Sequence, residues 1–212
     1  MDSNFFDENY YEFGVETGKS TYSQYRWLPE KTIPMVMSMI DYLNIKNYHT
    51  VLDVGCAKGY VVKAFRWLKR SSYGVDISDY ALENCDPEVK DWCFHLSELK
   101  TISENISFDW AIAKDVFEHI SYNDIEDFLF KIPGDCMFAV IPLGNGEKYY
   151  APVNNLDRSH IICKDMSWWV SMFEASNWKV EESKYHINGI KDAYYTRYPN
   201  AHGFFTLKRI DN

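Results

Sequence analysis

The 212-residue sequence predicts an α/β fold in which helices cover both faces of a mixed, mostly parallel sheet. Short apolar runs alternate along the chain with stretches of helical periodicity, a pattern typical of parallel sheets. The last two strand patterns, at 178–186 and 203–210, alternate apolar and polar residues and have no helical pattern between them. We therefore expect the sheet to end in an antiparallel pair, with an antiparallel last strand.

Seven strands and five helices follow from these patterns. The helix predicted at 33–44 has Pro34 in its first turn, where the missing N–H would have no helical partner anyway. Ser78 is a suitable N-cap for a helix after the second strand. The predicted strands are 50–54, 72–77, 91–96, 108–113, 136–141, 178–186 and 203–210, and the other helices are 59–69, 121–131 and 165–175.

Composition and charge exclude several classes of protein. The formal net charge of −9 opposes binding to phosphate backbones and to anionic lipid surfaces. The five cysteines are scattered and contain no CxxC pair, which indicates neither a disulfide framework nor a cysteine zinc site. The sequence has no signal-peptide pattern and no apolar run of membrane-spanning length. We expect a soluble, cytoplasmic protein that binds neither nucleic acid nor membrane.

The end of the first strand carries the first indication of a binding site. Asp53 and Gly55 close this strand, and Gly59 opens the next helix. The two glycines allow the backbone to turn and to approach a bound group at the carboxyl edge of the sheet. A strand-to-helix turn that merely needs glycine explains the pair equally well on its own.

A second acidic residue, Asp76, favours the binding site. It ends the second strand, where a carboxylate can accept hydrogen bonds from both hydroxyls of a ribose. A nicotinamide dehydrogenase uses the same geometry, but it requires GxGxxG, and this loop reads Gly55-Cys-Ala-Lys-Gly59. A carboxylate at Asp53 would crowd a pyrophosphate, whereas it suits a ligand that presents an ammonium group.

The segment Asp53-Val-Gly55-Cys-Ala-Lys-Gly59 resembles the first motif of the class I S-adenosylmethionine-dependent methyltransferases, and the resemblance extends over about 48–210. It implies a Rossmann-like seven-stranded sheet, S-adenosylmethionine as cofactor and S-adenosylhomocysteine as product. Two departures are Ala57, in place of a third loop glycine, and the missing acidic residue after the third strand. By resemblance, the cofactor is bound by Asp53, Gly55, Cys56, Ala57, Gly59, Asp76, Ile77, Leu96, Ser97 and Lys114.

Catalytic candidates come from segments that should end at the same edge of the sheet. Methyl transfer to a neutral hydroxyl needs a base, and His119 and His160 are the histidines in such segments, with Asp115 close by in sequence. An equally good alternative is that His119 only packs and orients a backbone carbonyl. The remaining histidines, His49, His95, His186 and His202, are expected to be structural.

A divalent metal ion is a further alternative for the same residues. The pattern Asp115-x-x-Glu118-His119 followed by His160 resembles the Glu-x-x-Glu-His…His pattern of magnesium-dependent small-RNA 2′-O-methyltransferases and ubiquinone-pathway O-methyltransferases. The same letters occur in metal-free relatives, so the pattern alone leaves the metal less favoured than a metal-free site.

We expect one domain over 1–212, with an N-terminal helical and aromatic cap at 1–47 and a core at 48–212. Tyr25 and Arg26 could reach the carboxylate of the cofactor, although Arg26 could equally be a surface residue. Together with the aromatic N-terminus, lid loops at 143–164 and 187–202 are expected to form the acceptor pocket. Their aromatic and cationic residues are Tyr149, Tyr150, Arg158, Tyr194, Tyr195 and Arg197.

The sequence therefore predicts methyl transfer to a small molecule, with O-methylation of a sugar or another polar metabolite favoured over N-methylation. A metal-dependent 2′-O-methyltransferase of RNA ends is an alternative, which the net charge opposes. A binding or partner protein that holds the cofactor without catalysis is a third.

Overall fold

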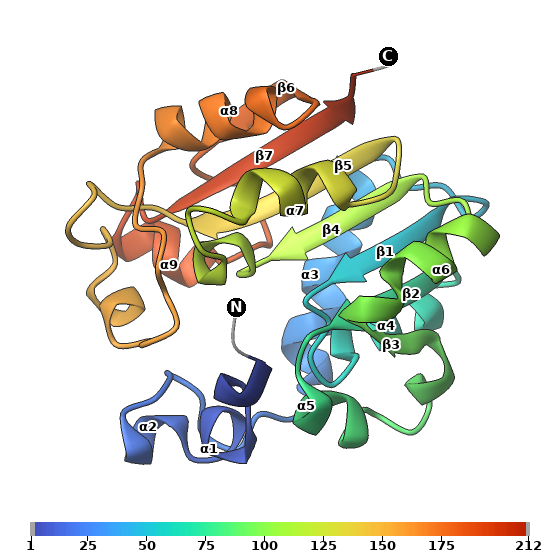
Figure 1. Ribbon diagram of the computed structural model, residues 1–212, viewed down its shortest axis with the longest axis horizontal. Helices are drawn as coiled ribbons and strands as arrows, with labels where there is room; N and C mark the ends of the chain where they lie inside the picture. Colours follow the sequence, from blue (N-terminus) through green and yellow to red (C-terminus); the bar gives the residue numbers. More distant parts are fainter. Residues whose placement is uncertain (1–2, 211–212) are drawn as a thin grey trace.

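The computed structural model describes residues 3–210, which form a seven-stranded sheet with the strand order β3-β2-β1-β4-β5-β7-β6 (Figure 1). The strands β1 to β5 are parallel, and β7 is antiparallel to both β5 and β6. The predicted fold class is therefore confirmed. The strands are β1 (Thr50–Val54), β2 (Ser71–Asp76), β3 (Cys93–His95), β4 (Trp110–Lys114), β5 (Cys136–Pro142), β6 (Trp178–Lys184) and β7 (His202–Arg209).

Nine α-helices and five 3-10 turns connect or flank these strands within the described residues. The α-helices are α1 (Glu8–Tyr11), α2 (Gly14–Thr17), α3 (Pro29–Tyr42), α4 (Tyr60–Trp67), α5 (Asp79–Glu83), α6 (Leu99–Asn105), α7 (Ile125–Lys131), α8 (Met166–Ala175) and α9 (Asp192–Arg197). The 3-10 turns are η1 (Ser3–Phe5), η2 (Lys90–Trp92), η3 (Leu96–Glu98), η4 (Phe117–His119) and η5 (Pro152–Asn155).

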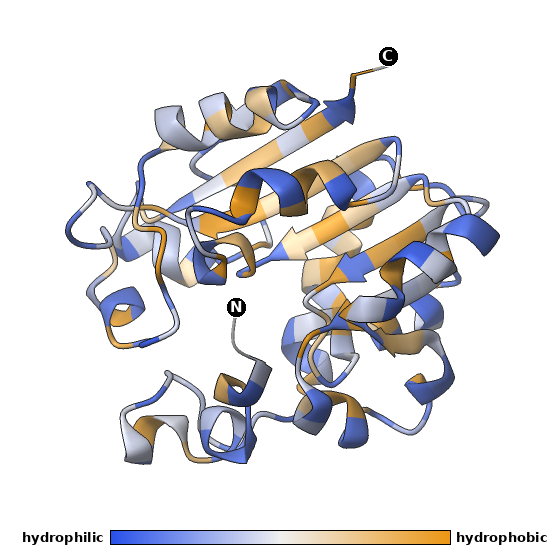
Figure 2. Cartoon of the chain, viewed as in Figure 1, coloured by the Kyte–Doolittle hydropathy of each residue, from blue (hydrophilic) through white to orange (hydrophobic). Residues whose placement is uncertain are grey.

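The sheet is buried between two layers of helices. Helices α6, α7 and α8 pack on one face, where Leu129, Trp169 and Phe173 are fully buried against strand residues. Helices α3 and α4 pack on the other face through residues such as Met39 and Phe65. The central strands are largely hydrophobic along their length (Figure 2), as expected for strands covered on both sides.

The N-terminal segment lies below the arrowheads of β1 and β4, at the carboxyl edge of the sheet (Figure 1). Its turns and short helices are held together by an aromatic cluster that includes Phe6, Tyr10 and Tyr11 and reaches Ala81 of α5. Helix α3, which we expected within the cap at 1–47, instead packs on the sheet with the core. The capping segment is thus limited to the residues before Pro29.

Several predicted elements were incomplete. The sequence between the last two strands contains α9, so the prediction of no helix there is wrong; the helix is short and exposed, and it leaves no apolar periodicity. Helix α6 was not predicted at all. Strand β3 is shorter than predicted because 3-10 turns replace its ends, and α3 begins at Pro29 rather than beside Pro34.

Among the helices of residues 3–210, none combines the length and the apolar character that crossing a membrane requires.

Helix α8 offers a test of the fold's local energetics. The carboxylate of Asp165 caps its N-terminus by accepting a hydrogen bond from the N–H of Trp168 at 2.9 Å. Asp165→Ala should lower the free energy of unfolding by about 1 kcal/mol, because one helix N–H loses its partner. Asp165→Asn retains an acceptor oxygen and should lose much less. Urea denaturation measures both, and equal losses in the two variants would contradict the capping role.

Candidate functional site

A cavity of about 740 Å³ opens at the carboxyl edge of the sheet, between the strand ends and the N-terminal segment. Most residues predicted to bind the cofactor line it: Tyr25, Asp53, Gly55, Cys56, Ala57, Asp76, Ile77, Leu96, Ser97 and Lys114. Two do not. Gly59 is buried at the start of α4, and Arg26 is exposed outside the cavity, so the structure does not bring its guanidinium to the site.

The loop between β1 and α4 adopts a conformation that needs its glycines. Gly55 and Gly59 have φ values of 76° and 78°, and a Cβ at Gly55 would lie 2.5 Å from Val116 Cγ2. Ala57 also has a positive φ, 48°, which is uncommon for a residue with a side chain. In this conformation, the N–H groups of Gly55 and Cys56 donate to the carbonyl oxygen of Val75 in β2, at 2.8 and 3.1 Å.

The carboxylate of Asp76 supports this loop directly. Its Oδ2 accepts a hydrogen bond from the N–H of Ala57 at 2.7 Å, and its Oδ1 accepts one from the N–H of Ser78 at 2.8 Å. The side chain is buried, yet it lines the cavity. Since each carboxylate oxygen can accept more than one hydrogen bond, Asp76 can also receive hydroxyl groups of a ligand.

Asp53 is the second buried carboxylate of the cavity. Burial raises its pKa to about 8, and the neighbouring charge of Asp76 adds to this shift while Lys114 opposes it. The free protein therefore keeps Asp53 largely protonated at neutral pH. A ligand ammonium at this position would favour the ionised form.

The wall opposite the sheet is built from aromatic residues of the N-terminal segment. Tyr11, Tyr22 and Tyr25 line the cavity, and the rings of Tyr22 and Tyr25 meet edge to face with centroids 4.8 Å apart. Within residues 3–210, no lining residue comes from 143–164 or 187–202. The prediction that these loops form the pocket lining, with the six tyrosine and arginine residues named for it, therefore does not hold.

Asp115, at the end of β4, lines the cavity in a left-handed conformation with a φ of 58°. Lys114 Nζ and Lys191 Nζ each lie 2.6 Å from one of its carboxylate oxygens. Although burial alone would raise the pKa of Asp115, the two lysines hold it well below its usual range. Because a lysine ammonium group occupies each carboxylate oxygen, neither oxygen is free to take a proton from an acceptor, which argues against Asp115 as the base.

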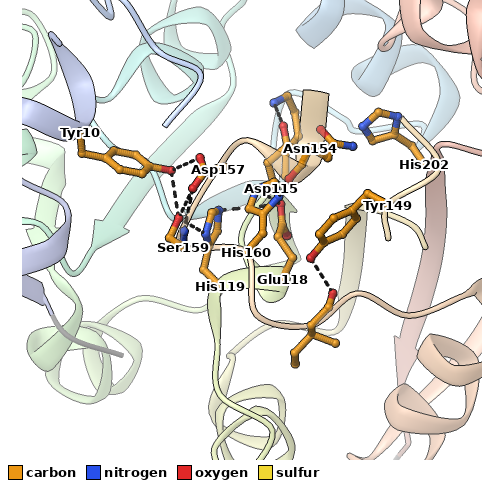
Figure 3. A network of polar contacts seen from close by, with 12 residues as sticks. Tyr10, Asp115, Glu118, His119, Tyr149, Asn154, Asp157, Ser159, His160 and His202 are labelled. Atoms are coloured by element: carbon orange, nitrogen blue, oxygen red, sulfur yellow. Dashed lines mark hydrogen bonds and ion pairs between the residues drawn. The ribbon is translucent and has the colours of Figure 1, made fainter. Parts of the chain in front are cut away.

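Two histidines and a glutamate meet behind the cavity wall (Figure 3). His119, from η4, lines the cavity. Glu118 and His160 lie beside His119 but do not line the cavity themselves. The Nε2 atoms of His119 and His160 each lie 3.8 Å from Glu118 Oε1. Asp115, the fourth predicted metal ligand, is not part of this group because the lysines occupy its carboxylate.

Burial disfavours the charged form of each residue in this group. It raises the pKa of Glu118 well above the usual range, an effect that the charge of Asp115 reinforces. Burial, together with His160, lowers the pKa of His119 to about 4, and burial also lowers the pKa of His160. Both carboxylate oxygens of Glu118 are buried without a hydrogen-bond partner among the described residues.

The group fits a divalent cation. One ligand atom from each residue lies within 4.8 Å of the others, and one carboxylate with two imidazoles is a common donor set. His160 is fixed in the appropriate form, because its Nδ1 lies 2.8 Å from the carbonyl oxygen of Asn154 and can only donate there. Its Nε2 therefore carries the lone pair.

No pattern in the sequence pairs His119 with the residues that contact it from the other side. Ser159 Oγ lies 2.8 Å from His119 Nδ1, and Ser159 also donates to Asp157. Asp157 in turn accepts from the hydroxyl of Tyr10. A serine and an aspartate in a loop are common in any sequence, and the pairing with Tyr10 spans 147 positions, so only the fold brings them together.

Comparison with known proteins agrees with this geometry. Residues 52–133 match the protein family described as a methyltransferase domain. No curated protein sequence matches the chain significantly.

Solved structures share the fold at low sequence identity. A S-adenosylmethionine-dependent methyltransferase from Archaeoglobus fulgidus is 12% identical with a TM-score of 0.61, covering 84% of this chain and 94% of that one. A chain from the complex between the Haloferax volcanii Trm112 methyltransferase activator and the putative methyltransferase is 13% identical with a TM-score of 0.61, covering 86% and 91%. The 1,6-didemethyltoxoflavin-N1-methyltransferase of Burkholderia thailandensis, solved with 1,6-didemethyltoxoflavin and S-adenosylhomocysteine, is 12% identical with a TM-score of 0.60, covering 86% and 80%.

The match of residues 52–133 to a methyltransferase domain and the fold shared with these structures are both features of S-adenosylmethionine-dependent methyltransferases. The predicted family, enzyme class and cofactor are thereby confirmed. The residues that bind the cofactor and the acceptor remain predictions from the geometry above.

Asp53 provides a test of the cofactor end of the cavity. With a pKa of about 8 in the free protein, roughly 0.9 of the Asp53 side chains carry a proton at pH 7. Binding of S-adenosylhomocysteine, whose ammonium favours the carboxylate, should release this proton, and affinity should rise with pH toward pH 8. Calorimetry in buffers of different ionisation enthalpy measures the release.

Asp53→Asn is the matched control for this measurement, because it keeps the shape of the side chain but cannot titrate. It should bind more weakly and should lose the proton release. The amino group of the ligand titrates near the same pH, so the difference between the two proteins is the informative quantity. Equal proton release in both would contradict the assignment.

Proposed function

We propose that the protein transfers the methyl group of S-adenosylmethionine to a hydroxyl oxygen of a small polar molecule. The observation that carries this proposal is that His119 lines the same cavity as Asp53 and Asp76. A potential base thus shares one enclosed space with the two carboxylates suited to hold the cofactor. We further propose a cytoplasmic location, which the five unpaired cysteines support.

The chemistry of the lining supports one arrangement of the cofactor. The ammonium of its methionine end is bound near Asp53, and the ribose hydroxyls are bound by Asp76. Leu96 and Ser97, at the start of η3, flank the adenine. Tyr25 covers the methionine end from the N-terminal segment, without a contribution from Arg26.

Methyl transfer is an in-line displacement, so the protein must mainly align the acceptor oxygen, the methyl group and the sulfur in a site that excludes water. The tyrosines of the N-terminal segment close the cavity from the side opposite the sheet. His119 Nε2 takes the proton of the acceptor hydroxyl. Asp115 keeps Lys114 and Lys191 in place rather than acting as a base.

A metal-assisted variant of the same reaction is the second candidate, and the unpartnered carboxylate of Glu118 favours it. Glu118, His119 and His160 would hold the ion, which when bound would lower the pKa of a coordinated acceptor hydroxyl. Methylation of RNA ends would fit such a site, but the net charge of −9 opposes it.

Turnover tests the proposed function. The wild-type protein should convert S-adenosylmethionine to S-adenosylhomocysteine in the presence of a hydroxyl acceptor from a panel of sugars and other polar metabolites. His119→Ala should lower kcat about 10²- to 10⁴-fold while the affinity for S-adenosylhomocysteine stays close to that of the wild type. His49→Ala, at a histidine outside the cavity lining, is the control. Cofactor binding without turnover across the whole panel would favour a non-catalytic binding protein.

Metal removal separates the two catalytic variants. If Glu118, His119 and His160 hold an ion, dialysis against a chelator should abolish turnover, and Mn²⁺ or Mg²⁺ should restore it. Metal analysis should find about one ion per chain in the wild-type protein and none in Glu118→Gln, because the amide cannot supply the anionic ligand. Turnover that is indifferent to the chelator would exclude the metal-assisted variant and leave His119 as the base.

A further inference from the structure

A buried chain of hydrogen bonds connects the N-terminal segment to His119 (Figure 3). Tyr10 Oη donates to Asp157 Oδ2 at 3.0 Å. Asp157 Oδ1 accepts from the backbone N–H of Ser159 at 2.9 Å and also from its hydroxyl. Tyr10, Asp157 and Ser159 are each less than 10% exposed, at 4%, 6% and 8%. Water is therefore largely excluded as a competing partner.

The direction of these hydrogen bonds fixes the proton of His119. A serine hydroxyl has a single proton, and here it is donated to Asp157, whose carboxylate can only accept. Ser159 Oγ therefore meets His119 Nδ1, 2.8 Å away, as an acceptor. Nδ1 must carry a proton, and in the neutral imidazole Nε2 is then left with its lone pair.

The other tautomer of His119, with the proton on Nε2, would be favoured by a contact with Glu118. A proton on Nε2 would point toward Glu118 Oε1, 3.8 Å away, which has no hydrogen-bond partner among the described residues. The buried carboxyl group would thus gain a donor. The contacts with Ser159 and Asp157 work against this arrangement and leave Glu118 without that donor.

We propose that Ser159, Asp157 and Tyr10 are positioning residues that hold the proton of His119 on Nδ1 and keep Nε2 free for the reaction. This inference deepens the proposed function and rests on it, since His119 needs a free Nε2 lone pair both as a base and as a metal ligand. Tyr10 belongs to α1 and also lines the cavity. The N-terminal segment therefore both encloses the ligand and completes the hydrogen-bond chain that prepares His119.

Nuclear magnetic resonance of ¹⁵N-labelled imidazole tests the tautomer without any need for turnover. At pH 8, well above the ordinary pKa of histidine of about 6.5, the imidazole is neutral and its two nitrogens give distinct signals. His119→Gln identifies the signals by their loss. In the metal-free wild-type protein, Nδ1 should be the protonated nitrogen of His119.

Variants of Ser159 supply the matched comparison. Ser159→Ala removes the acceptor of Nδ1–H, so the proton should shift to Nε2, whereas Ser159→Thr keeps a hydroxyl and should keep the wild-type form. Ser171→Ala, an exposed serine of α8, should change nothing. Once a molecule that accepts the methyl group has been identified, Ser159→Ala should lower kcat about 10- to 100-fold with little change in the KM for the cofactor.

Two results would overturn the proposal: a wild-type His119 protonated on Nε2, or an unchanged tautomer in Ser159→Ala. If Ser159→Ala does not fold, Asp157→Ala and Tyr10→Phe take its place, since each removes the hydrogen bond between Tyr10 and Asp157 and should raise the Nε2–H population. If the wild-type protein shows no turnover, the proposed function is contradicted. The inference about the tautomer of His119 is not, because the resonance measurement does not require turnover.

Discussion

The site depends on one carboxylate at the end of β2. Asp76 accepts a hydrogen bond from Ala57 in the loop after β1 and another from Ser78 at the start of α5. These two bonds join three segments at the carboxyl edge of the sheet before any ligand is present. They also offset the unfavourable backbone conformation of Ala57, since the N–H of that residue gains an anionic acceptor. The shape of the cavity floor is therefore a property of the folded chain itself.

Electrostatics divide the cavity into two regions. Asp53 and Asp76 are the carboxylates that suit a cationic ligand, and burial, reinforced by the charge of Asp76, raises the pKa of Asp53 to about 8. At the end of β4, Lys114 and Lys191 neutralise Asp115, which also lines the cavity. The local charge balance of this part of the cavity therefore differs from the net charge of −9 of the whole chain.

The fold could be predicted from the sequence because its strands are covered on both sides. Such strands appear as apolar runs, and β1 was placed at its observed bounds, Thr50–Val54. The residues proposed for the cofactor side of the site could also be predicted from the sequence, since Asp53, Gly55 and Asp76 lie at fixed positions relative to those strands. Helix α9 and the hydrogen-bond chain of Tyr10, Asp157 and Ser159 were not, because neither leaves a periodic pattern and the chain joins distant segments. Arg26 shows the opposite error: its residue type suited a carboxylate, but its backbone position leaves it exposed.

The outer strand β6 has features that protect the edge of the sheet against pairing with a further strand. Only one of its edges is paired, with β7, and a register shift falls between Val180 and Glu182. Its exposed side chains form the ion pairs Lys179–Glu181 and Glu182–Lys184. An irregular, charged edge is a poor template for another strand, because pairing would bring these charges together and strip them of water. The charged, irregular border of β6 therefore disfavours the addition of a strand from a second molecule to this apolar sheet.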